Sequence, residues 1–159
     1  MKRVRLWSLV FGALITTAIP CLASSERPAT IEERARGANR VVVATVAETT
    51  ARYERNEFGD ELIVTYVRLA IEEVLKGQSG PVTVALEGGT VDGITLRVSS
   101  LPSLSKGERA VFFVTPGRGG EFRPHLRGQG ILKLNAEDRV PGSSLTLNQI
   151  RQSARAAAK

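Results

Sequence analysis

Residues suited to chemistry gather near His125, the only histidine of this 159-residue chain. Arg118, Arg123 and Arg127 flank it closely in the sequence. A lone imidazole without cysteine neighbours does not build a usual zinc site, which takes several His, Cys or carboxylate ligands. No Gly-x-Ser-x-Gly sequence supplies the nucleophile elbow of a serine hydrolase. We therefore predict no catalytic, metal or cofactor site here, and interpret the four residues as a partner-binding hairpin.

Acidic side chains offer the alternative of a carboxylate-based hydrolase that acts on extracellular polymers. Such an enzyme needs two carboxyl groups that flank one substrate bond. Glu72 and Glu73 are adjacent, but neighbours on a strand point to opposite faces of the sheet. The alternative therefore requires two of five acids to converge in one cleft: Glu72, Glu73, Glu87, Asp92 and Glu108.

Basic residues at the C-terminus offer a second alternative, a structural protein of the cell envelope. Arg151, Arg155 and Lys159 are four residues apart, so on a helix they form one stripe that an anionic surface would attract. Cations near a helix C-terminus also stabilise the helix itself, by about 0.3–1 kcal/mol each. The formal net charge of +6 falls to about +3 without the three cations of residues 1–5. Nucleic-acid-binding domains carry a denser basic face, so we expect no nucleic-acid partner.

Residues 1–23 have the order of a secretory signal peptide: a basic start, an apolar middle and a small-residue cleavage site. The uncharged run of residues 6–19 is shorter than the about 20 residues that span a bilayer. We expect cleavage after Ala23, a periplasmic or extracellular product, and no transmembrane anchor in that product. Cys21 follows Pro20, where a lipoprotein signal has a small, flexible residue, so we do not expect lipidation at Cys21.

Two short helices are predicted on either side of a central domain. Residues 24–37 read as a polar lead-in and a short helix, which the Thr-Ile-Glu-Glu sequence at 30–33 opens as a capping box. Residues 143–159 are predicted to form a C-terminal helix and tail, and Thr146 and Gln149 have the spacing of a second capping box.

The central residues 38–142 are predicted to form a β-domain, because short apolar runs alternate with Gly- and Pro-containing turns. The longest run, 62–75, keeps its alternation only if a bulge near Glu72 and Glu73 returns Val74 to the interior. Residues 48–61 are polar and are expected to form an exposed connection. We predict a mainly β fold, a small antiparallel OB-like barrel of about six or seven strands with the two helices attached.

Three segments in this order resemble the netrin-type module: Arg-Val-Val-Val-Ala-Thr-Val at 40–46, Val-Arg-Leu-Ala-Ile-Glu-Glu-Val-Leu-Lys-Gly at 67–77, and Leu-Ser-Lys-Gly-Glu-Arg-Ala-Val-Phe-Phe-Val at 104–114. The best-known members of that family are the tissue inhibitors of metalloproteinases, and cysteine-free secreted bacterial proteins have a similar layout. The resemblance covers roughly residues 38–134 and implies an OB-like barrel. Those inhibitors chelate the protease zinc through an N-terminal cysteine, whereas here a mature N-terminus at Cys21 would require a disfavoured cleavage after Pro20. Their inhibitory mechanism and functional residues are therefore not carried over.

Together these patterns predict a secreted, non-enzymatic binding or regulatory module that engages a secreted or envelope protein, such as a protease. Recognition is expected on loops at 48–61, 99–108 and 118–127, because loops on a rigid scaffold commonly carry it. The hydrolase and the envelope-associated protein remain the alternatives.

Overall fold

The computed structural model describes residues 27–56 and 58–157. The predicted signal peptide, including Cys21, lies outside the described residues, as does Lys159. The elements are α1 (Ile31–Gly37), β1 (Arg40–Arg55), β2 (Glu61–Lys76), β3 (Val82–Glu87), β4 (Gly89–Val91), β5 (Ile94–Leu96), β6 (Arg109–Pro116), β7 (Phe122–Pro124), the 3₁₀ turn η1 (Arg127–Gly130), β8 (Ile131–Leu134) and α2 (Leu147–Ala157).

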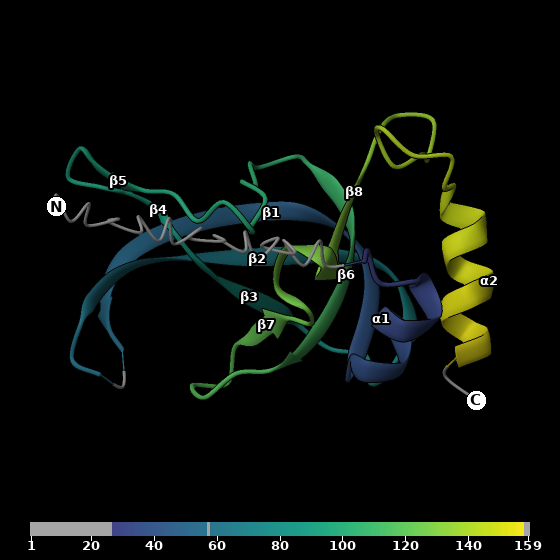
Figure 1. The fold of residues 1–159 in the computed structure, drawn as a ribbon, viewed down its shortest axis with the longest axis horizontal. Helices are drawn as coiled ribbons and strands as arrows, with labels where there is room; N and C mark the ends of the chain where they lie inside the picture. The colour runs from purple at the N-terminus through teal and green to yellow at the C-terminus, as the bar shows by residue number, and fades with distance from the viewer. Residues whose placement is uncertain (1–26, 57, 158–159) are drawn as a thin grey trace, which may run out of the picture.

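Five strands close into a ring in the order β1-β2-β3-β7-β6, and β6 pairs back onto β1. All neighbours are antiparallel except β3 and β7, which run parallel and meet only at Val84 and Phe122. β8 extends the ring by pairing with β6, and β4 and β5 form a separate hairpin. A five-stranded, partly open barrel is the OB architecture, so the predicted fold class is confirmed (Figure 1).

Alternation along the strands gives the barrel two apolar layers. Val42 and Val46 of β1 point into the barrel with Phe112 of β6, and all three are buried. Val41 and Val43 point outward instead and are covered by α1 and α2. The start of β1 is therefore apolar and buried on both faces, because the two helices cover this end of the barrel (Figure 1).

A bulge bends β2 where the sequence predicts one. Val43 pairs with Glu73, whereas Ala44 pairs with Ile71, so Glu72 is the extra residue on β2. Val74 then packs against the barrel core. Because a bulge increases local bend and twist, the long strand can follow the curved wall of a small barrel.

Helix ends are fixed by specific partners. Thr30 and Glu33 form the predicted capping box of α1. At the other end, the Nζ of Lys76 donates to the carbonyl oxygens of Ala35 and Ala38, at 2.8 Å and 2.7 Å. The ammonium group thereby satisfies carbonyl groups that a helix C-terminus leaves without partners. Lys76 thus ties α1 to the end of β2.

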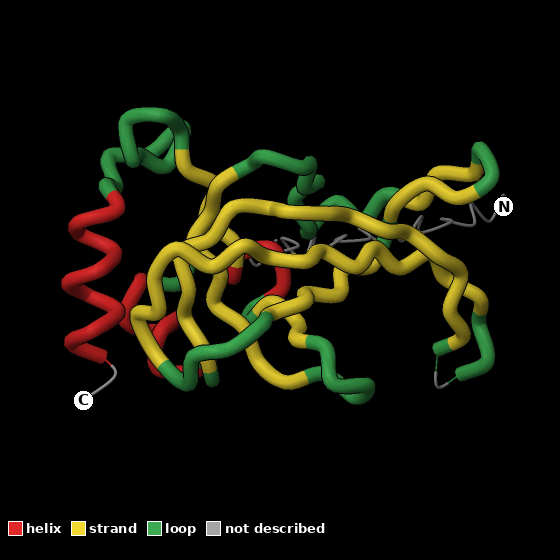
Figure 2. Tube along the Cα trace, turned by 180° about the vertical axis from the view of Figure 1, so that it is seen from behind, coloured by secondary structure: helices red, strands yellow, loops and turns green. Residues whose placement is uncertain are grey.

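The prediction of an exposed connection at 48–61 is wrong, because most of this segment is strand. β1 continues to Arg55 and β2 begins at Glu61, so the two strands extend beyond the barrel as a hairpin arm (Figure 2). The β1 half of the arm is mostly exposed on both faces, so no apolar alternation marks it as strand. Among the described residues, no helix combines the length and apolarity needed to cross a bilayer.

Candidate functional site

Of the four residues predicted to bind a partner, the three arginines lie around Glu87, and His125 lies apart from them. Arg118 and Arg123 line a groove on the outer face of the barrel. Arg127 forms an ion pair with Glu87 at 3.3 Å. His125 lies against α1, where a Cβ placed on Gly37 would be 2.1 Å from the imidazole Nε2. Leu126 and Arg127 have left-handed φ angles of 55° and 52°, so the chain reverses after β7. His125 thereby lies against α1, whereas Arg123 and Arg127 line one cavity.

His125 has a packing role in this fold. Its ring is half-buried against α1. Burial lowers the pKa of the imidazole below its ordinary value, and the positive charge of Lys76 lowers it further. A neutral imidazole on the helix is therefore favoured in the folded protein.

The groove has a volume of about 700 Å³. One wall is the tip of the β1–β2 arm, the other is the turn between β6 and β7, and the floor is formed by β2 and β3. Both turns lie on the same side of the barrel in Figures 1 and 2. We call it the loop groove, lined by Arg52, Glu54, Arg55, Asn56, Phe58, Leu62, Val64, Tyr66, Thr83, Glu87, Arg118, Gly119, Gly120, Glu121 and Arg123. The strand 2–3 face and the corresponding two loops are the place where OB folds bind ligands.

Three side chains form an ordered cluster on the groove floor. The guanidinium of Arg52 lies over the ring of Tyr66, 4.3 Å from its centroid. Glu54 accepts hydrogen bonds from Arg52, at 2.9 Å to Nε and 2.7 Å to Nη2, and from the hydroxyl group of Tyr66. The hydrogen bond from Tyr66 is the main cause that lowers the pKa of Glu54. The pKa of Tyr66 is raised, first by its burial and then by Glu54.

Two other arginines of the groove are available to a ligand. Arg55 and Arg123 are exposed, and neither makes a hydrogen bond or ion pair with a described residue. Glu121 is turned back onto its own turn, where it accepts a hydrogen bond from the backbone N–H of Gly119 at 2.9 Å. At the tip of the arm, Phe58 is 82% exposed. The groove therefore offers cationic and aromatic groups together.

The acids that the hydrolase alternative needs are held apart. Four of the five are engaged by different cations on separate elements, in the pairs Glu72–Arg109, Glu73–Arg151, Glu87–Arg127 and Glu108–Lys133. Asp92 lies in the turn between β4 and β5 with a φ of 49°. The described part of the chain also holds no group of three or more His, Cys, Asp and Glu residues that could bind a metal ion.

The basic stripe of the C-terminal helix is used within the fold. Arg151 and Arg155 of α2 both bind the carboxylate of Glu73 on β2, each at 2.7 Å. Because these guanidinium groups fasten the helix to the sheet, they are less available to an outside anionic surface.

The sequence placed recognition on the 48–61 segment, which supplies Arg52, Arg55 and Phe58, but it singled out none of these side chains and did not include Tyr66 of β2. The sequence signal for these side chains was weak, because this stretch of β1 is mostly exposed on both faces and has no apolar alternation. Comparison with protein-family models finds none that matches the chain, and comparison with curated proteins finds no match either. The resemblance to the netrin-type module therefore stays a prediction.

Proposed function

We propose that this chain is a secreted, non-enzymatic binding module that engages a protein partner through the loop groove. The observation that carries the proposal is the pair of exposed arginines, Arg55 and Arg123, facing a groove that also holds Tyr66 and Phe58. Protein interfaces are enriched in Arg, Tyr and Phe, and their most important residues are commonly Tyr and Arg.

The charges that line the loop groove indicate what kind of partner surface would bind there. Four arginines and three glutamates line the groove, and Glu54 is already bound by Arg52 and Tyr66. An acidic loop of the partner is therefore the complement of Arg55 and Arg123, and this charge arrangement would speed association at low salt. The resemblance to the netrin-type module makes a secreted protease the first partner to test.

The contacts within the groove floor support binding. Arg52, Glu54 and Tyr66 are held by mutual contacts before any ligand arrives, so fewer side chains need to be ordered on association. The alternative of envelope attachment through α2 has less support, because Arg151 and Arg155 are bound to Glu73.

The experiment is affinity capture with the full chain, produced with its own leader and a C-terminal tag, from the secreted and envelope proteins of its source. The groove variant Arg55→Glu/Arg123→Glu is compared with a control that reverses two exposed cations outside the groove and outside the three expected recognition loops, Arg36→Glu/Arg139→Glu. We expect a protein retained by the wild type and the control and lost from the groove variant. Equal retention by all three baits, or no retained protein with a folded bait, would contradict the proposal.

A further inference from the structure

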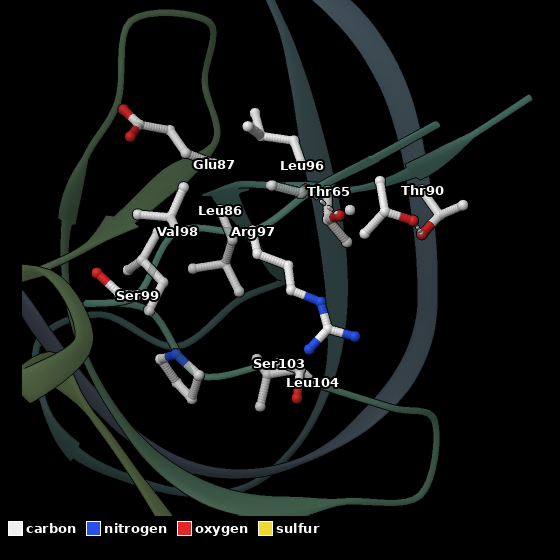
Figure 3. A pocket seen from close by; sticks show the side chains of 15 residues that line it. Thr65, Leu86, Glu87, Thr90, Leu96, Arg97, Val98, Ser99, Ser103 and Leu104 are labelled. Carbon is white, nitrogen blue, oxygen red and sulfur yellow. Dashed lines mark hydrogen bonds between the residues drawn. The ribbon is translucent and has the colours of Figure 1, made fainter. Parts of the chain in front are cut away.

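A second cavity, the hairpin pocket, lies beside the β4–β5 hairpin and has a volume of about 460 Å³. Its walls are residues 86–90, 95–99 and 101–104, and Thr65 of β2 completes the lining (Figure 3). Small-molecule sites commonly have volumes of about 300–1,000 Å³. The pocket is distinct from the loop groove, since Glu87 is the one described residue that lines both.

The floor of the hairpin pocket is apolar and continuous with the barrel interior. Leu86 is a buried member of the barrel core. Leu101 and Leu104 are half-buried and pack against the same core. Leu96 and Val98 add half-buried apolar surface from the hairpin side. A ligand with an apolar chain would lose contact with water on this floor, which favours binding.

An exposed cation lies over this floor. Arg97 is exposed, and it makes no hydrogen bond or ion pair with a described residue. Figure 3 shows its guanidinium stretched across the cavity towards Ser103 and Leu104. Glu87, the other charged residue of the lining, points away from it and is bound by Arg127. The pocket therefore presents one positive charge that no carboxylate of its lining neutralises.

The hydroxyl groups of the pocket divide into two kinds. Thr65 donates to the carbonyl oxygen of Gly88 at 2.6 Å, and the hydroxyl oxygens of Thr90 and Thr95 are 2.9 Å apart. The hydroxyl groups of Ser99 and Ser103 make no hydrogen bond with a described residue, and the Arg97 guanidinium points towards Ser103 in Figure 3. A guanidinium and a free hydroxyl group together match the acceptor oxygens of a carboxylate.

We propose that the hairpin pocket binds a small monoanionic amphiphile, a carboxylate with an unbranched apolar chain. Arg97 and Ser103 bind the carboxylate, and the chain lies on Leu86, Leu101 and Leu104. This site is independent of the protein partner proposed for the loop groove.

The test is calorimetric titration of the whole protein with octanoate. Acetate probes the carboxylate group alone, and 1-octanol probes the alkyl chain alone. We expect octanoate to bind at least about tenfold more tightly than either probe. Arg97→Gln weakens octanoate binding at least about tenfold, as expected for loss of a charge-assisted hydrogen bond. The same substitution leaves 1-octanol binding unchanged. Lys106→Gln, which removes an exposed cation outside the pocket, has no effect.

Two results would overturn the proposal: equal octanoate affinity for the wild type and Arg97→Gln, or acetate binding as tightly as octanoate. Amide chemical shifts provide a readout that needs no variant, since octanoate must perturb Leu101 and Leu104 in the wild type. The groove variant Arg55→Glu/Arg123→Glu must retain octanoate binding. Failure at the loop groove is thereby distinguished from failure at the hairpin pocket.

Discussion

The guanidinium of Arg52 lies over the aromatic ring of Tyr66, 4.3 Å from its centroid, and Glu54 binds both side chains. The three residues come from two neighbouring strands of the arm. Each contacts the other two, so the three side chains form one connected cluster on the floor of the loop groove. This cluster beside the exposed Arg55 and Arg123 is the arrangement on which the proposed function depends.

The first prediction concerns acid stability through Glu54. Hydrogen bonding from Tyr66 and Arg52 lowers the pKa of Glu54 below 4.5, so the folded protein favours the charged form. Its contribution to stability is complete above pH 4.5 and is lost as the pH falls towards the lowered pKa. Glu54→Gln should therefore be less stable than wild type at pH 7, and the difference should shrink in acid. Urea unfolding at several pH values measures this, and a difference independent of pH would exclude it.

The second prediction concerns the tie between Lys76 and α1. Lys76→Met removes an ammonium group that donates to the carbonyl oxygens of Ala35 and Ala38. Hydrogen bonds to charged groups contribute about 1.5–3 kcal/mol, so we expect a loss of about 2 kcal/mol in the free energy of unfolding. The control Lys106→Met alters an exposed lysine and should change stability by less than about 0.5 kcal/mol. Equal effects of the two substitutions would show that the tie has no energetic role.

The third prediction concerns the titration of His125. Its pKa lies below 6.5 because the ring is buried and because Lys76 is nearby. The stability that His125 contributes is therefore complete above pH 6.5 and declines as the pH falls towards the lowered pKa. Lys76→Met should raise the pKa, and Lys106→Met should leave it unchanged. Proton NMR of the single imidazole follows both directly. A pKa above 6.5 in the wild type would contradict the packing described here.

The fourth prediction concerns the leader. Full-length chain produced in its source should be recovered outside the cytoplasm with Ser24 as its first residue. Ala23→Arg should block this cleavage, because signal peptidase requires a small residue before the cut. Terminal sequencing and intact mass identify the product. A cytoplasmic protein that retains Met1 would refute export, and a lipid mass on Cys21 would refute the expected cleavage site.

Much of the barrel is predictable because its strands carry a periodic apolar signal. The bulge at Glu72 is found from sequence because two adjacent acids interrupt that alternation, and one of them must leave the register. The capping boxes are equally local, since Thr30 and Glu33 meet within one helical turn. Such features depend on neighbours in the chain, so the sequence alone reveals them.

The site is less predictable because it depends on where distant residues meet. Arg123 and Arg55 share the groove only because β7 pairs in parallel with β3 and the arm extends past the barrel. Residues close in sequence can separate, as His125 does when the left-handed φ angles after β7 reverse the chain. Likewise, Arg151 and Arg155 form the expected stripe, but the position of Glu73 decides what they bind.

Photo-crosslinking from the tip of the arm tests the central claim most directly. A benzophenone side chain at position 58 replaces Phe58, which is 82% exposed at the groove, and one at position 94 replaces Ile94, which is 61% exposed on the other hairpin. Irradiation in the presence of secreted and envelope proteins should yield a protein adduct from position 58 and none from position 94. An adduct from position 94 alone, or no adduct from either, would contradict a partner site at the loop groove.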